Sequence, residues 1–226
     1  MQIGIRKIHM AAFAVILALS ASYAVHAQEH AAGVHHGFHD AARWAQVFES
    51  PERAKWQKPD EVVQAMKLQP GQQVFDIGAG TGYFTRRFAK AVAPSGEAVG
   101  LDIEPAMVDY MKADAKKQGL KNYDARLVKP DDPELVPHSA DVVFFCDTLH
   151  HMDSRVAYFR KITPALKPGG RVIVIDFKKK ALPVGPPPAD KLAREEVIAE
   201  FRAAGYRLRR DHDFLPYQYF LEFEPE

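Results

Sequence analysis

The chain has 226 residues, of which 47% are hydrophobic and 26% are charged, an ordinary composition for one α/β domain with its own core. The formal net charge of +1 excludes a broad basic surface, so we expect no nucleic-acid partner. The single cysteine, Cys146, excludes an internal disulfide, and its apolar neighbours predict a buried side chain rather than a nucleophile.

The N-terminus has the three parts of a secretory signal peptide. Arg6 and Lys7 precede the apolar run Met10–Leu19, and small residues lead to Val25-His26-Ala27. We therefore expect residues 1–27 to be a cleaved signal peptide, with export to the periplasm or medium and no stable membrane span afterwards. The alternative is a membrane anchor formed by residues 8–25, although the apolar core is shorter than the ~20 residues that a span needs.

Residues 28–54 are expected to form an N-terminal extension, first flexible and then helical. The four histidines within residues 30–39 lie among alanine and glycine, with no cysteine and no rigid element to fix a geometry. We therefore expect a flexible segment and no metal site. From Asp40 onward, apolar residues recur at helical spacing and predict a single helix that stops before Pro59.

Residues 74–85, V-F-D-I-G-A-G-T-G-Y-F-T, are typical of a buried strand that runs into a glycine turn and then into a helix. The glycines remove Cβ atoms where the backbone turns tightly and a ligand approaches, and Thr81 is expected to help start the helix. The spacing G-x-G-x-G differs from the dinucleotide pattern, which requires glycine where Tyr83 stands. Asp76 would repel a pyrophosphate but would accept hydrogen bonds from a cationic amino-acid end.

The run D-I-G-A-G-T-G resembles the first motif of the class I S-adenosylmethionine-dependent methyltransferases, and L-K-P-G-G-R is also typical of that family. The resemblance covers roughly residues 55–226, which we expect to form one methyltransferase domain. It implies S-adenosylmethionine as cofactor and a Rossmann-like, seven-stranded sheet whose last pair of strands is antiparallel. The pieces W-Q-K-P and F-L-P-Y-Q-Y-F-L also look like an exported bacterial subgroup of unknown substrate.

The order of strand and helix patterns independently predicts a mostly parallel, doubly wound α/β sheet. Strands are expected at 74–77, 97–102, 124–128, 141–146, 171–176, 206–214 and 217–223, and helices at 59–66, 84–92, 104–118, 156–166 and 190–204. Residues 178–188 form a proline-rich connector from the same edge of the sheet, either a lid over the substrate or a passive linker.

Ten residues near the carboxyl ends of the strands are the expected cofactor site: Asp76, Gly78, Ala79, Gly80, Thr81, Gly82, Asp102, Ile103, Asp131 and Asp147. Asp102 lies where a βαβ unit presents an acid to ribose hydroxyls, although a helix N-cap is the alternative. The resemblance implies an acid after the third strand that contacts adenine. Lys129 and Pro130 stand there instead, so Asp131 or Asp132 is a candidate only.

His150 and His151 follow the apolar strand 141–146 and are the candidate catalytic bases. Packing of this loop against the cofactor is an equally open interpretation. Residues 217–219, Tyr-Gln-Tyr, either line the acceptor site or belong to the core. The residues identify neither the acceptor, which we expect to be a small molecule, nor the oligomeric state.

Two other functions stay open at this point. The first is an exported, non-catalytic protein that binds an adenosyl ligand in the same fold, because the methyl donor is made in the cytosol. The second is a dehydrogenase, which Tyr83 disfavours because that position requires glycine in a dinucleotide turn.

Overall fold

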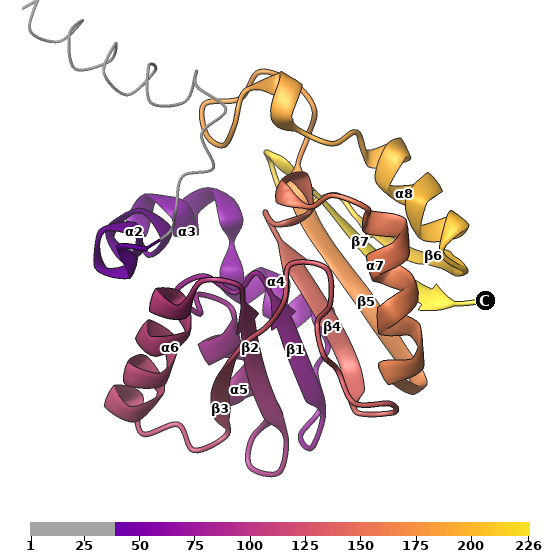
Figure 1. Ribbon diagram of the computed structural model, residues 1–226. Coiled ribbons are helices and arrows are strands. Elements are labelled where there is room, and N and C mark those ends of the chain that lie inside the picture. Colours follow the sequence, from indigo (N-terminus) through magenta and orange to yellow (C-terminus); the bar gives the residue numbers. More distant parts are fainter. Residues whose placement is uncertain (1–38) are drawn as a thin grey trace, which may run out of the picture. The chain divides into compact units, whose positions relative to one another are not determined.

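The computed structural model describes residues 39–226, shown as coloured ribbon in Figure 1. The expected signal peptide and the histidines before residue 39 lie outside the described residues. The central element is a seven-stranded sheet with the order β3-β2-β1-β4-β5-β7-β6. Its strands are β1 (Gln73–Ile77), β2 (Glu97–Asp102), β3 (Tyr123–Leu127), β4 (Ala140–Cys146), β5 (Leu166–Phe177), β6 (Tyr206–His212) and β7 (Gln218–Pro225).

Strands β1 to β5 are parallel, and β7 is antiparallel to both β5 and β6. This confirms the predicted mostly parallel sheet with an antiparallel closing pair. The middle strands are buried on both sides, and residues 142–145 of β4 have essentially no exposed surface. Such continuous apolar strands are expected where helices cover both faces of a parallel sheet.

The helices divide between the two faces of the sheet (Figure 1). On one face, Phe88 and Met111 pack against the sheet from α5 and α6. On the other, Phe159 and Phe201 pack from α7 and α8, with ring centroids 3.9 Å apart. The bounds are α4 (Pro59–Met66), α5 (Thr85–Val92), α6 (Pro105–Gln118), α7 (Arg155–Ile162) and α8 (Arg194–Ala203).

The helix expected from Asp40 to the residue before Pro59 is two helices, so that prediction was wrong. The chain forms α2 (Ala41–Phe48) and α3 (Pro51–Gln57), separated at Glu49 and Ser50. The Ser50 hydroxyl accepts a hydrogen bond from the Glu52 N–H, and proline occupies the first position of α3. Serine followed by proline is a strong helix start, because proline lacks the N–H that the first turn leaves unbonded.

The remaining boundaries differ from the predictions by a few residues. β5 begins at Leu166 and includes the L-K-P-G-G run, because Leu166 pairs with Ala140 before a register shift in the ladder. α8 begins at Arg194 rather than near 190, where a short 3-10 turn (Pro188–Asp190) stands instead. Within residues 39–226, no helix is both long enough and apolar enough to cross a membrane.

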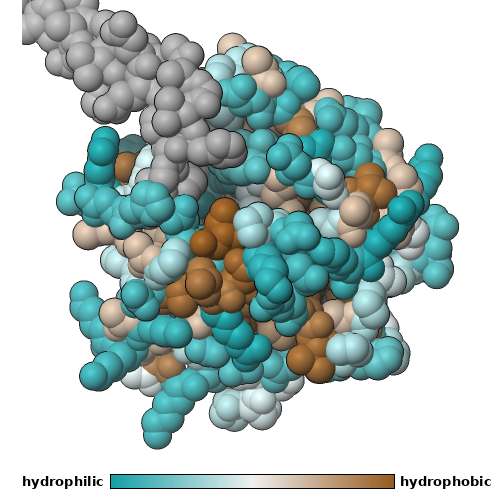
Figure 2. Space-filling model, in the orientation of Figure 1, coloured by the Kyte–Doolittle hydropathy of each residue, from teal (hydrophilic) through white to brown (hydrophobic). Residues whose placement is uncertain are grey.

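The connection from β3 to β4, residues 128–139, contains no helix. Hydrophobic residues gather near the middle of the face seen in Figure 2, among mostly hydrophilic ones. Ile103 after β2, Leu127 at the end of β3 and Val136 in this connection each expose more than half of their surface.

The carboxyl ends of β1, β2, β4 and β5 meet at one edge of the sheet, where open α/β folds bind ligands.

Candidate active site

The glycine turn after β1 has three glycines with positive φ angles, 69° at Gly78, 56° at Gly80 and 74° at Gly82. A Cβ at Gly78 would lie 2.4 Å from a Thr148 side-chain carbon, and one at Gly82 would lie 1.8 Å from the Tyr123 hydroxyl oxygen. The glycines therefore serve both backbone conformation and close packing by the protein's own side chains.

Thr81 does not start the following helix, so that prediction was wrong. α5 begins at Thr85, and Phe84 occupies the N-cap position without a side-chain hydrogen bond. Residues 80–84 are turns, which carry the chain past the end of β1 before the helix forms. The Thr81 hydroxyl is buried and makes no hydrogen bond of ordinary geometry, so it presents an unsatisfied polar atom at the turn.

Asp102, at the end of β2, fixes the glycine turn from the neighbouring strand. One carboxylate oxygen accepts the Gly80 N–H at 2.7 Å, and the other accepts the Glu104 N–H at 3.0 Å. Burial raises the pKa of Asp102. Glu104, not Asp102, holds the N-cap position of α6, so the N-cap alternative does not describe this residue. Ile103 beside it is half exposed.

Asp76 lies one residue before the end of β1 and is 3% exposed. Its carboxylate accepts a hydrogen bond from the Thr85 hydroxyl at 2.6 Å. Burial raises the pKa of Asp76 to about 7, although the Thr85 hydrogen bond opposes that rise. Few groups around Asp76 stabilise its negative charge. A cationic ligand group would therefore bind favourably beside Asp76, because it would stabilise the ionised carboxylate.

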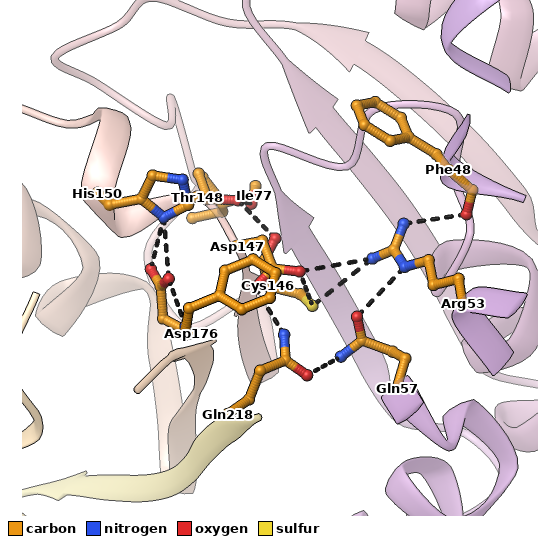
Figure 3. A network of polar contacts seen from close by, with 11 residues as sticks. Phe48, Arg53, Gln57, Ile77, Cys146, Asp147, Thr148, His150, Asp176 and Gln218 are labelled. Atoms are coloured by element: carbon orange, nitrogen blue, oxygen red, sulfur yellow. Dashed lines mark hydrogen bonds and ion pairs between the residues drawn. The ribbon is translucent and has the colours of Figure 1, made fainter. Parts of the chain in front are cut away.

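His150 and Asp176 form a buried pair between the ends of β4 and β5 (Figure 3). His150 Nδ1 lies 2.9 Å from one Asp176 oxygen and 3.1 Å from the other, and Asp176 has no exposed surface. Burial acts to lower the pKa of His150, but the hydrogen bond and charge of Asp176 outweigh it and raise the pKa. With its Nδ1–H on Asp176, the neutral ring carries its lone pair on Nε2, the arrangement of a general base.

His151 is exposed, and its ring centroid lies 4.1 Å from that of His150. The two histidines are thus adjacent, and His150 is paired with Asp176. His150, Asp147 and the glycine turn converge on one edge of the sheet, because Thr148, between Asp147 and His150, bonds the carbonyl of Ile77 at the end of β1.

Asp147 stands at the end of β4 in a left-handed backbone conformation, with φ of 56°. Gln218 Nε2 donates to one of its oxygens at 2.6 Å, and Gln57 Nε2 donates to Gln218 Oε1 at 2.6 Å. Arg53 Nε donates to Gln57 Oε1 at 3.2 Å. Figure 3 shows this relay, which links α3, the start of β7 and the end of β4.

Sequence reasoning missed Arg53, Gln57 and Asp176, and it left Gln218 open between core and acceptor site. Asp176 carried a usable signal, since it ends an apolar strand in the same way as Asp147 does. The side chains of Gln57 and Gln218 are hydrogen-bonded although they are 161 positions apart in sequence. No local sequence pattern predicts such a contact. Burial with satisfied polar atoms explains the glutamines' place in the core.

Asp131 is not brought together with the other candidate residues. Lys161, in the last turn of α7, donates to the Asp131 carbonyl oxygen at 2.6 Å and pairs with the carboxylates of both Asp131 and Asp132. α7 starts near the carboxyl end of β4 and leads into the start of β5. Its last turn therefore lies toward the opposite edge of the sheet from the glycine turn.

An aromatic surface adjoins His150. We use this term for Trp56 of α3, Phe177 at the end of β5 and Tyr217 before β7, whose ring centroids lie 5.7 Å (Trp56–Phe177) and 6.3 Å (Trp56–Tyr217) apart. Phe177 lies 6.4 Å from His150, centroid to centroid. The connector contacts the same surface, because a Cβ at Gly185 would lie 2.7 Å from the Phe177 ring. Gln218 and Tyr219 are buried behind it.

Comparisons with known proteins agree with this geometry. Residues 68–205 match the family model Methyltransf_31, described as a methyltransferase domain. The ubiquinone/menaquinone biosynthesis C-methyltransferase UbiE of Ectopseudomonas mendocina is 30% identical, over 70% of this chain and 69% of that protein. The UbiE protein of Burkholderia cenocepacia strain HI2424 is 32% identical, over 66% of this chain and 65% of that protein. The chain thus spans about two thirds of these relatives.

Among solved structures, a SAM-dependent methyltransferase from Aquifex aeolicus superposes with a TM-score of 0.76 at 25% identity, over 81% of this chain and 97% of that one. The [4+2]-cyclase SpnF has a TM-score of 0.62 at 23% identity, over 71% and 60% of the two chains, which is a likeness of fold alone. The fold and the edge of acidic residues define a class I S-adenosylmethionine-dependent methyltransferase. Within that class, the chain belongs to the Methyltransf_31 family of methyltransferase domains.

The residues present fit S-adenosylmethionine. The unsatisfied Thr81 hydroxyl lies at the turn, the Asp76 carboxyl is buried, and the Asp147 carboxyl has a raised pKa although Arg53 lies 3.8 Å away. Asp102 would be the acid that accepts the ribose hydroxyls, since each of its oxygens retains a further lone pair. Tyr83 is 6% exposed and packs edge-on against Phe84 at 5.4 Å, where a dinucleotide turn would have glycine.

Proposed function

We propose that this enzyme methylates a small-molecule acceptor and that His150 removes the proton which the acceptor loses. The single observation that carries the proposal is the buried His150–Asp176 pair, with Nδ1 on the carboxylate and Nε2 left for an acceptor proton. When bound, the cofactor supplies an electrophilic methyl group on a sulfonium sulfur. The acceptor atom gains that methyl group, its proton goes to His150 Nε2, and the sulfur retains the electron pair of the broken bond.

His151 is the second candidate for a catalytic role. It is exposed, and its ring centroid lies 4.1 Å from that of His150, whose own ring is buried against Asp176. We propose that His151 lines the entrance to the acceptor site rather than accepting the proton. The two histidines thus provide a matched pair for mutagenesis, since they are adjacent in sequence and in contact through their rings.

The aromatic surface favours a planar, largely apolar acceptor. Trp56, Phe177 and Tyr217 come from three elements that are distant in sequence, and the Phe177 ring lies 6.4 Å from that of His150. Flat rings stack on such side chains with centroids about 4.5–7 Å apart. The relatives named as ubiquinone/menaquinone biosynthesis C-methyltransferases are consistent with a ring acceptor. The connector at Gly185 contacts the Phe177 ring directly, so we propose that it acts as a lid and moves away to admit the acceptor ring.

The test is a radiolabel transfer assay with a panel of phenols, quinols and amines, using the wild-type chain and the variants His150→Gln and His151→Gln. We expect transfer to a ring compound, and a loss of about 10²–10⁴ in kcat for His150→Gln, because that is the usual contribution of a positioned base. His151→Gln should retain kcat within about threefold. Equal losses in both variants would contradict the assignment of His150 as the base.

We also propose that the mature chain begins at Gln28 and resides in the periplasm. The support is the sequence of residues 1–27, which lie outside the described residues. Cell fractionation with mass analysis of the N-terminus is the test. A soluble cytosolic protein that retains Met1 would contradict export, and a membrane-bound one that retains residues 8–25 would favour an anchor.

A further inference from the structure

Arg53 stands at one end of the polar relay, yet nothing in its sequence surroundings marks it as functional. Its side chain is 14% exposed. Nε donates to Gln57 Oε1 at 3.2 Å, and one terminal nitrogen donates to the Phe48 carbonyl oxygen at 3.1 Å. The guanidinium also lies 4.3 Å from the centroid of the Tyr83 ring. Two hydrogen bonds and a ring contact therefore fix its orientation.

The second terminal nitrogen of Arg53 has only long contacts. It lies 3.8 Å from an Asp147 oxygen and 3.9 Å from the Cys146 sulfur. Charge-assisted hydrogen bonds from a guanidinium to a carboxylate are usually about 2.7–2.9 Å long. This nitrogen is therefore held in place, turned toward the cofactor edge, without a close acceptor oxygen.

Two carboxyls lie at this edge of the sheet: Asp147, whose side chain is 18% exposed, and Asp76, which is buried. Asp147 ends β4, Asp76 lies near the end of β1, and the two strands are neighbours in the sheet. Burial raises the pKa of each carboxyl, and the positive charge of Arg53 lowers both without restoring them to ordinary values. This edge thus holds two carboxyls whose negative charges are only partly stabilised. It also holds one guanidinium nitrogen that has no acceptor oxygen at ordinary hydrogen-bond distance.

A ligand that carries both an ammonium and a carboxylate matches this arrangement. Its ammonium would compensate Asp147 and Asp76, and its carboxylate would take the free donors of Arg53, so all of these groups gain a charged partner. We propose that Arg53 binds the carboxylate of the amino-acid end of the cofactor, with Asp147 on its ammonium. This inference rests on the methyltransferase function and adds α3 to the cofactor site.

This proposal also explains the role of the polar relay between Arg53 and Asp147. Gln57 and Gln218 join Arg53 to Asp147 through the hydrogen bonds of buried amides, which sets the spacing between the cation and the carboxylate. α3 is thereby positioned by the same hydrogen bonds that position the ligand-binding groups. A ligand without the amino-acid end would leave this part of the site unused.

The experiment compares two ligands on three forms of the protein by calorimetry. S-adenosylhomocysteine carries the amino-acid end, and 5′-methylthioadenosine lacks it. Arg53→Gln should weaken the first about tenfold to a hundredfold and leave the second within about twofold, because a charge-assisted bond contributes only to the first. Arg87→Gln is the matched control, since its guanidinium lies 4.2 Å from the same Tyr83 ring. It should change neither affinity by more than about threefold.

A second measurement needs no variant and covers the case in which Arg53→Gln fails to fold. Decarboxylated S-adenosylmethionine keeps the ammonium and loses the carboxylate, so it should bind the wild-type chain at least about tenfold more weakly than S-adenosylmethionine. Equal affinities, or equal weakening of both ligands by Arg53→Gln, would overturn the proposal. Wild-type protein that binds none of the adenosyl ligands would instead overturn the methyltransferase function itself.

Discussion

The two halves of the carboxyl edge hold their acidic residues in different ways. On the β1–β2 side, Asp102 and Asp76 accept hydrogen bonds from backbone N–H groups and a hydroxyl within 22 positions of sequence. On the β4–β5 side, Asp147 and Asp176 bond side chains from other elements, up to 71 positions away, although Asp176 also accepts the Phe177 N–H. Turn geometry thus determines the first half, and tertiary packing determines the second.

The two halves differ in the kind of groups that hold their carboxylates. Backbone N–H groups are supplied by any sequence that adopts the glycine turn, so few side chains are constrained there. The β4–β5 half holds a titratable pair and an amide relay, and each group requires a partner of one chemical type at one distance. Variants on the two sides should therefore differ in both size and kind of effect.

The largest expected effect is on the β1–β2 side, from Gly82→Ala. A left-handed alanine costs about 1–2 kcal/mol, and the overlap with the buried Tyr123 adds about 1–3 kcal/mol, so we expect a loss of about 2–5 kcal/mol. Gly119→Ala is the control, because its φ is 67° but nothing lies within 4 Å of the added carbon. It should cost only the backbone term. Equal losses in urea denaturation would show that packing against Tyr123 does not matter.

The second prediction concerns pH and Asp76. Its folded pKa of about 7 lies above the ordinary 3.8, so the folded state binds the proton more tightly than the unfolded state. The wild-type free energy of unfolding should therefore fall by roughly 3 kcal/mol as pH rises from about 4 to 7 through this group alone. Asp76→Asn should lack that part of the fall. Urea denaturation at several pH values measures the difference, and parallel curves for the two proteins would refute the prediction.

The third prediction moves to the β4–β5 side, with Asp176→Asn. The variant removes the charge that raises the pKa of His150, so that pKa should fall, as an NMR titration of the ring would report. The pair stabilises the fold by about 1.5–3 kcal/mol when His150 is charged. This contribution is complete below about pH 6.5 and disappears as pH rises through the raised folded pKa. The destabilisation should therefore be larger at pH 6 than at pH 9; a pH-independent loss would refute it.

The smallest expected effects compare a buried residue of α3, Gln57, with an exposed one, Lys55. Gln57→Leu removes the hydrogen-bond partner of the buried Gln218 Oε1 and of Arg53 Nε and should cost about 1–2 kcal/mol. Lys55→Ala, two residues before Gln57 on the same helix, breaks the exposed pair with Glu52 and should cost less than about 0.5 kcal/mol. Thermal unfolding of both variants tests the difference. If Lys55→Ala costs as much, helix propensity rather than the relay stabilises α3.

Much of the fold could be predicted from the sequence, because it depends on short patterns. Apolar runs such as residues 142–145 predict buried parallel strands, and the glycine turn marks the first crossover. The helix break at Ser50-Pro51 was also present in the sequence as a start signal, but the apolar spacing on both sides concealed it. Asp131 was expected at the cofactor edge but contacts Lys161 of α7, because no pattern in residues 128–139 indicates where that connection runs.

By itself, the sequence determined the class of fold, the cofactor and the acids that end β1, β2 and β4, because each follows from a strand, a turn and the residues directly after them. Only the tertiary structure decided that His150 pairs with Asp176, that Gln57 meets Gln218 and that Arg53 of α3 reaches the end of β4. The physical reason is that a buried polar group must find its partner wherever packing places one, and that distance in sequence carries no information about it.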